Sequence, residues 1–81
     1  DRDYVEKVLD FITKKYNVSA DKVKLSIGES SRALIRRKPK LILVNDMKNP
    51  QLKFILKMAK EKNIQVKEEN LFDYACVAIL E

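Results

Sequence analysis

A run of four apolar residues at positions 41–44, Leu-Ile-Leu-Val, limits what this chain can fold into more than any other feature. The run is too short for a helix and rich in branched side chains, so we expect a strand. Successive side chains of a strand point to opposite faces of the sheet, and neither face of this run is polar. Both faces should therefore be buried, which requires packing layers on the two sides of the sheet.

The pattern of the remaining chain supplies those layers. Apolar residues recur with a period of two where we expect strands, and at three- and four-residue spacing where we expect helices. Helices are expected at residues 3–16, 29–37 and 50–63, strands at 23–27, 41–44, 64–66 and 76–80, and a turn or short helix at 68–74. This alternation predicts an α/β fold, a three-layer α/β/α sandwich around a mixed sheet of about four strands. Where neighbouring strands are parallel, right-handed crossovers are expected.

The ends of the predicted helices carry typical capping residues. Asn17 should adopt a left-handed conformation after the first helix. Asn49 should cap the third helix, with Pro50 at its first position, where a missing N–H costs nothing. The first helix also has a continuous apolar stripe, which we expect to pack in the core rather than bind a partner. The stripe consists of Val5, Val8, Leu9, Ile12 and Tyr16.

Length and composition restrict the domain organisation and the chemistry. The 81 residues are enough for one domain. The chain has no His and a single Cys, Cys76, which excludes an internal disulfide, Cys- or His-based metal sites, and Ser-His or Cys-His catalysis. With only one Gly, it also lacks a glycine-rich phosphate loop. We therefore expect no enzymatic activity, no cofactor and no metal.

Charge and cysteine usage indicate the kind of partner and the compartment. Seventeen Lys and Arg against twelve Asp and Glu give a net charge of +5, which favours a polyanionic partner, most commonly nucleic acid. Small basic domains that bind only protein are the alternative. The lone Cys favours a reducing compartment. Because we find no signal peptide and no apolar run of ~20 residues, we expect a cytoplasmic protein that does not enter a membrane.

The second predicted helix concentrates positive charge. Arg32 and Arg36 are four residues apart and share a face, and Arg36, Arg37 and Lys38 form a continuous run. The planar fork of Arg suits phosphates and guanine edges. The alternative is a solvated helix end, because cations are favoured near any helix C-terminus. The aromatic residues lie on other elements, which argues against stacking of single strands and for recognition of folded RNA by its shape and phosphates.

Two residues next to predicted strands are candidates for a site. Gly28, the only glycine, lies between a strand and the basic helix, which suggests a positive φ or the close approach of another molecule, although a plain turn is the stronger expectation from this feature alone. Either Gly28 or Ser30 is expected to cap this helix. Asp46 follows the apolar strand, at the end where α/β active sites occur. Since it has no second acid, His or nucleophile beside it in the sequence, we expect Asp46 to stabilise its loop.

The stretch SIGESSRALIRRKPKLILVNDMKNPQL (residues 26–52), followed by FILKMAKEKNIQV, resembles the ribosomal protein L-seven-Ae/L-thirty-e family of kink-turn RNA-binding proteins. That family carries Gly-x-Asn-Glu-x-x-Lys at the start of the RNA-binding helix, then an Ala-Leu pair and a basic end. A Lys-Leu-Val-Ile-type strand and an acidic loop with Pro follow. Here Glu29 and Arg32 match the Glu and Lys positions, and Asp46 and Pro50 match the loop. The spacing holds without gaps from residue 26 to about residue 66.

The resemblance implies a single RNA-binding domain over residues 1–81 that grips a kinked internal loop with tandem sheared G·A pairs. Glu29 would accept hydrogen bonds from a guanine of those pairs, and Arg32 and Arg36 would contact the RNA. Asp46 would lie in a loop that borders the RNA surface. The residues expected to bind RNA are Ser26, Ile27, Gly28, Glu29, Arg32, Arg36, Arg37, Lys38 and Asp46.

The implied function is non-catalytic binding of a structured ribosomal or other noncoding RNA within a ribonucleoprotein, either the ribosome or an RNA-processing particle such as RNase P, alongside its other subunits. A protein-interaction domain on the same scaffold is the alternative. It is motivated by Gly28 at the family's Asn position and by a shorter segment after Val66. An exposed group of arginines beside Glu29 would favour RNA, whereas arginines neutralised by acids of the same chain would favour a protein partner.

Overall fold

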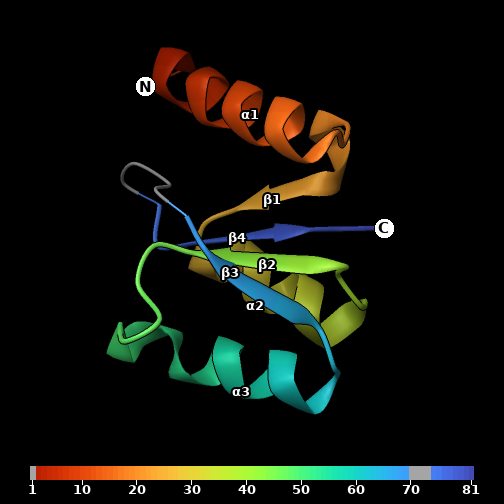
Figure 1. Cartoon of the computed structure of the whole chain (residues 1–81), viewed down its shortest axis with the longest axis vertical. Coiled ribbons are helices and arrows are strands. Elements are labelled where there is room, and N and C mark those ends of the chain that lie inside the picture. Colours follow the sequence, from red (N-terminus) through yellow and green to blue (C-terminus); the bar gives the residue numbers. More distant parts are fainter. Residues whose placement is uncertain (1, 70–73) are drawn as a thin grey trace.

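The structure, a computed structural model, describes residues 2–69 and 74–81. Helices and strands alternate along this part of the chain (Figure 1). In order they are α1 (Arg2–Tyr16), the 3-10 helix η1 (Ala20–Lys22), β1 (Val23–Leu25), α2 (Ile27–Arg36), β2 (Leu41–Val44), the 3-10 helix η2 (Pro50–Leu52), α3 (Lys53–Glu61), β3 (Gln65–Glu68) and β4 (Cys76–Ile79). No helix in the described ranges is both long enough and apolar enough to cross a bilayer.

The four strands form one mixed sheet in the order β1-β4-β2-β3. β4 runs antiparallel to both β1 and β2, and β2 runs parallel to β3. The two central strands, β2 and β4, are buried along their whole length, as the apolar run at 41–44 predicts. Because β1, β2 and β3 point the same way, their carboxyl ends lie at one end of the sheet.

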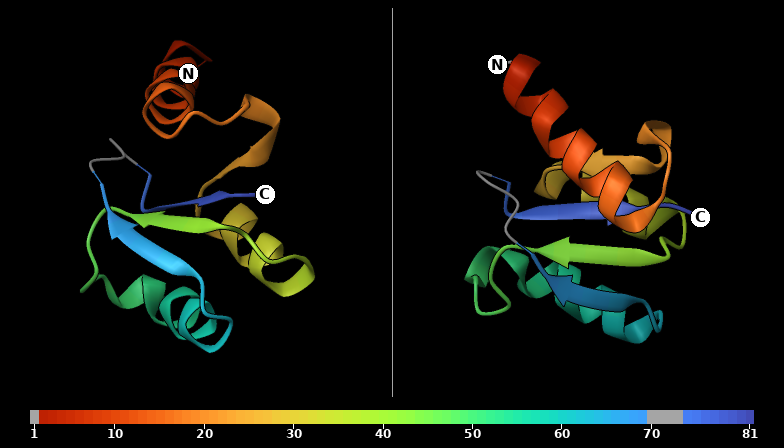
Figure 2. Two further views of the ribbon diagram at one scale, coloured as in Figure 1. Left: turned by 45° about the vertical axis from the view of Figure 1, so that its right-hand side comes forward. Right: turned by 45° about the horizontal axis from the view of Figure 1, so that its top comes forward.

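Helices cover both faces of the sheet, α1 on one side and α2 with α3 on the other (Figures 1 and 2). Val8 and Ile12 of α1 pack with Leu43 of β2 in one core. The preceding residue of β2, Ile42, faces the other side of the sheet and packs with Leu34 of α2 in the second core. The predicted three-layer α/β/α sandwich is therefore confirmed, and all residues of the apolar stripe except Val5 belong to the core or pack against it.

A polar contact fixes the end of α1 to the segment after β3. The Tyr16 hydroxyl donates to Glu69 Oε1 at 2.5 Å, and Lys15 Nζ lies 2.6 Å from the same oxygen. Burial and this hydrogen bond raise the pKa of Tyr16 to about 12. Hydrogen bonds from Lys15 and Tyr16 hold the pKa of Glu69 below its ordinary value. Glu69 also donates its backbone N–H to the carbonyl of Val44, which ties this contact to the sheet.

The junction between β1 and α2 differs from the sequence-based expectation. The strand ends at Leu25, and the residue with a positive φ is Ser26, at φ 79° and ψ 161°. Gly28 has no positive φ, and no atom lies within 4 Å of where its Cβ would stand. The positive φ suggested for Gly28 is therefore wrong, and Ser26 takes it instead. The expected cap is wrong as well, because Ser26 rather than Gly28 or Ser30 is the N-cap of α2.

Other boundaries follow the predicted capping residues. Asn17 and Asn63 have φ of 54° and 60°, so both helices that precede them end in left-handed asparagines. Asn49 accepts a hydrogen bond from the N–H of Gln51 at 3.0 Å, which confirms the predicted cap. The helix expected from Pro50 begins with η2 and continues as α3. Of the turn or short helix expected at 68–74, residues 70–73 lie outside the described residues, and Glu68 is the last residue of β3.

Candidate nucleic-acid interface

The Ser26 turn sets the direction in which α2 leaves the sheet. The carbonyl of Ser26 accepts from the N–H of Ser30 at 3.0 Å, which begins the helix, and its side chain accepts from the N–H of Glu29 at 3.5 Å. The Ser30 hydroxyl is fully buried and donates to the carbonyl of Lys24, so the first turn of α2 is held against β1. With Ser30 and Ala33 facing inward, the residues on the opposite side of the helix face solvent.

The outward face of α2 carries one carboxylate and two guanidinium groups. Glu29, Arg32 and Arg36 are spaced by three and four residues, so they lie on one face of the helix, and all three are exposed. Glu29 is in the first turn of α2, where the helix dipole favours a negative charge. Arg37 follows at the C-cap. The rigid helix thus fixes an acceptor and a row of donors relative to one another.

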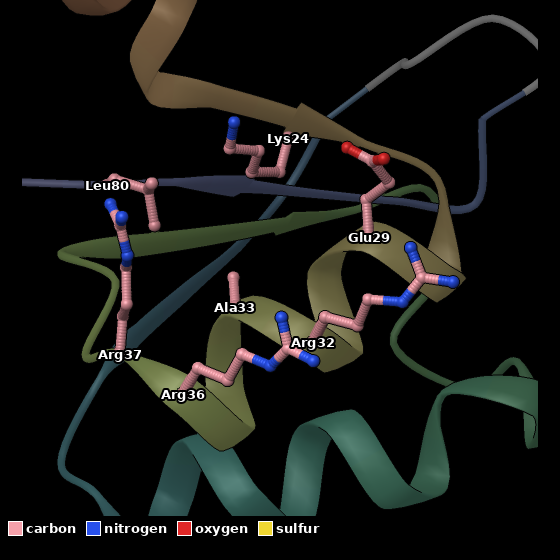
Figure 3. A pocket seen from close by; sticks show the side chains of 7 residues that line it. All are labelled: Lys24, Glu29, Arg32, Ala33, Arg36, Arg37 and Leu80. Atoms are coloured by element: carbon pink, nitrogen blue, oxygen red, sulfur yellow. The ribbon is translucent and has the colours of Figure 1, made fainter.

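These side chains surround one pocket, which we call the α2 pocket. Figure 3 shows Arg32 and Arg36 extending from α2, Arg37 reaching toward Leu80 after β4, and Lys24 standing on β1. The lining residues are Lys24, Glu29, Arg32, Ala33, Arg36, Arg37 and Leu80. Four cations and a single carboxylate therefore meet where α2 passes under the β1 edge of the sheet.

The arginines of the α2 pocket form no ion pair with an acid of the described residues. Within residues 2–69 and 74–81, the structure has one ion pair, between Lys15 and Glu69, on α1 and after β3. No Asp or Glu of that part of the chain lies within 4.0 Å of the charged nitrogens of Arg32 or Arg36. Uncompensated cations lining a hollow create a positive potential that attracts polyanions. This arrangement matches the outcome that the sequence-based reasoning assigned to RNA rather than to a protein partner.

The structure distributes the nine predicted site residues over different positions. Four of them meet in the α2 pocket: Glu29, Arg32, Arg36 and Arg37. Lys38 lines a neighbouring pocket with Arg36 and Arg37. Ser26 forms the turn into α2, Gly28 lies in the first turn of the helix, and Ile27 is partly buried against the core, so that its side chain serves packing.

Asp46 does not line either pocket. It lies after β2, at the same end of the sheet as the Ser26 turn. Its Oδ1 accepts from the N–H of Lys48 at 2.9 Å, which confirms the expected loop-stabilising role. The N–H of Met47 donates to Glu68 Oε2 at 2.9 Å, so the loop is also fixed to β3.

Sequence reasoning missed Lys24, Leu80 and Lys62. The first two line the α2 pocket from β1 and from the end of β4. Lys62, the C-cap of α3, lines the neighbouring pocket and donates to the carbonyls of Leu34 and Arg37. The alternation of β1 identifies Lys24 as outward-facing, but nothing local in the sequence shows that this strand lies beside α2.

Comparison with known proteins agrees with an RNA-binding role for this geometry. No curated protein matches the chain. Residues 4–81 match the family described as the PELOTA RNA binding domain. The match confirms an RNA-binding domain, whereas the more specific resemblance to the L-seven-Ae/L-thirty-e proteins stays a prediction. Because the match spans nearly all of the 81 residues, the chain belongs to the PELOTA RNA-binding domain family.

Proposed function

We propose that this chain is a non-catalytic domain that binds a kink-turn-like structured RNA through the α2 pocket, as part of a ribonucleoprotein. The observation that carries the proposal is the exposed Glu29 carboxylate, which lines the same pocket as three arginines that form no ion pair in the described residues. RNA offers groups for both charges, because guanine donates through its N–H groups and phosphates accept. A plain anion site would need only the cations.

The two kinds of side chain would have different tasks in this proposal. Arg32 and Arg36 can neutralise phosphates and position the backbone without reading sequence. Glu29 can accept from a guanine edge, and this contact would discriminate between bases. All three side chains come from one helix whose first turn is held by buried Ser30. The backbone that carries them therefore needs little ordering when RNA binds.

The proposed setting is the cytoplasm, where the single thiol stays reduced. Cys76 is buried in β4, and burial raises the pKa of its thiol, so that it is unreactive core. The protein-interaction alternative predicts arginines neutralised within the chain, and the described residues contain no such pair. The RNA proposal therefore has the better support.

Replacing Glu29 tests the proposal. We expect Glu29→Ala to weaken binding to a kink-turn duplex by about 1–3 kcal/mol, the usual value of a good base contact. Binding to a duplex in which the G·A pairs are replaced by Watson–Crick pairs should change little, because that duplex presents no sheared guanine edge. Glu29→Gln should show a smaller loss, since the amide oxygen still accepts.

Fluorescence anisotropy with both RNAs measures these differences. The salt concentration is ~50 mM, at which phosphate contacts are strong. Glu6→Ala is the matched control, because Glu6 is also an exposed glutamate but lies on α1, across the sheet. Equal loss on both RNAs would refute the guanine contact. The absence of binding to either RNA by the unmodified chain would refute RNA binding through this pocket altogether.

A further inference from the structure

A second basic pocket lies where α2 and α3 end. The two helices pack together on the same face of the sheet and run in the same direction (Figure 1), so their C-terminal ends come together. We call this hollow the helix-end pocket; it is lined by Ile35, Arg36, Arg37, Lys38 and Lys62. Arg36 and Arg37 also line the α2 pocket, so the two hollows lie on either side of these arginines.

Helix capping explains only one of these cations. The last carbonyls of a helix lack partners within it, and a lysine that donates to them stabilises the helix end. Lys62 does this, donating to the carbonyls of Leu34 and Arg37. In the described residues, the side chains of Arg36, Arg37 and Lys38 have neither a carbonyl nor a carboxylate partner. Three exposed cations in one pocket repel one another, and an anion that binds between them would offset this repulsion.

Ile35 adds an apolar surface to this positive pocket. Its side chain is 61% exposed, although branched apolar residues are usually buried. One residue along a helix is a rotation of about 100°, so Ile35 and Arg36 leave α2 in different directions, although both line this pocket. A hollow lined by four cations and one apolar side chain fits a sugar-phosphate backbone, whose phosphates are charged and whose ribose ring has apolar faces.

We propose that the helix-end pocket binds a second stretch of the RNA backbone, so that phosphates lie on both sides of the C-terminal turn of α2. This inference rests on the proposed RNA binding and extends its footprint from α2 to the end of α3. A bent RNA suits the arrangement, because its two arms approach a protein from different directions. The α2 pocket contacts one stretch of backbone, and the helix-end pocket contacts the other.

Lys38 tests the inference, because it lines only the helix-end pocket and is exposed. Each phosphate contact adds about 0.9 to the slope of log affinity against log salt. If Lys38→Gln removes one contact, and that contact contributes nothing at about 1 M salt, affinity should fall about 15-fold at ~50 mM salt and about fourfold at ~200 mM. Ile35→Glu should weaken binding further, because it places a carboxylate in the lining of the pocket, where it repels phosphates.

The control is Lys14→Gln, which removes the same charge from an exposed position on α1. Binding of a kink-turn duplex is measured for each variant over that salt range, with Arg32→Gln included to report on the α2 pocket. We expect Lys38→Gln and Ile35→Glu to weaken binding and Lys14→Gln to change it little. If both helix-end variants behave like Lys14→Gln while Arg32→Gln is weakened, the helix-end pocket is overturned and the proposed function stands.

Two further outcomes are decisive. If the unmodified chain binds no RNA, the proposed function fails, and this inference fails with it. Suppose that Lys38→Gln weakens the binding of poly-glutamate but leaves the affinity for RNA unchanged. The pocket then belongs to an acidic protein partner, and the inference is overturned.

Discussion

The backbone of Ser26 provides a quantitative test of how the β1–α2 turn is built. At φ 79° and ψ 161°, Ser26 occupies a region that is essentially restricted to glycine, and a residue held there costs about 1–3 kcal/mol. Glycine adopts the same conformation without a Cβ clash. Ser26→Gly should therefore release about 2 kcal/mol of strain, the middle of that range.

Two smaller effects oppose this gain. Glycine loses more backbone entropy on folding, which costs about 0.4–1 kcal/mol. The Ser26 side chain also caps α2, but its contact with the N–H of Glu29 is long at 3.5 Å, and a change from Ser to Gly at an N-cap costs only a few tenths of a kcal/mol. The net expectation for Ser26→Gly is a gain of about 1 kcal/mol in the free energy of unfolding.

Thermal unfolding followed by circular dichroism measures this change. For a domain of this size, about 1 kcal/mol corresponds to a rise in melting temperature of roughly 4–8 °C. Ser31→Gly is the matched control, because Ser31 lies inside α2, where glycine should cost about 0.5–1 kcal/mol. Ser26→Ala should also destabilise, since it keeps the strain and loses the cap. A Ser26→Gly protein that melts below the unmodified chain would show that the turn is not strained.

Two other contacts give predictions for stability. Lys62→Met should lower the free energy of unfolding by about 1 kcal/mol in urea titration, because the carbonyls of Leu34 and Arg37 lose their donor; an unchanged midpoint would contradict the capping role. Tyr16→Phe should cost about 0.5–1.5 kcal/mol through the lost hydrogen bond to Glu69. Because the folded-state pKa of Glu69 is depressed, its contribution is present above the ordinary value of 4.5 and is lost as pH falls through the folded-state pKa. The stability difference between the unmodified chain and Glu69→Gln should therefore shrink as the solution is acidified below pH 4.5, and a constant difference would refute this coupling.

Local sequence patterns predicted the elements of the fold well. The run at 41–44 required cover on both faces, and the cores on its two sides provide it. The apolar stripe of α1 and the caps at Asn17 and Asn49 were also read correctly, because these signals depend on neighbours within one or two turns. At the β1–α2 junction the sequence suggested either a plain turn or a positive φ at Gly28, and the chain places the positive φ at Ser26 instead. The tertiary packing of buried Ser30 against β1 overrides the local preference there.

The candidate site was only partly predictable for a different reason. Glu29, Arg32 and Arg36 share a helix face, so their spacing alone brings them together. Lys24 and Leu80 join the α2 pocket because β4 inserts between β1 and β2, and strand order is not a local property of the sequence. The sequence also does not show whether acidic side chains pair with these arginines, since that depends on which surfaces of the fold face one another.

The salt dependence of RNA binding tests the central claim, that the cations of α2 hold RNA phosphates. For the unmodified chain, about four phosphate contacts predict a slope of log affinity against log salt of about −3 to −4 with a kink-turn duplex. The double variant Arg32→Gln/Arg36→Gln should reduce the magnitude of that slope by about 2. The control Lys7→Gln/Lys14→Gln, which removes two exposed charges from α1, should leave it unchanged. The same slope for both double variants would contradict the account, because the α2 arginines would then contribute no more than lysines on the far side of the sheet.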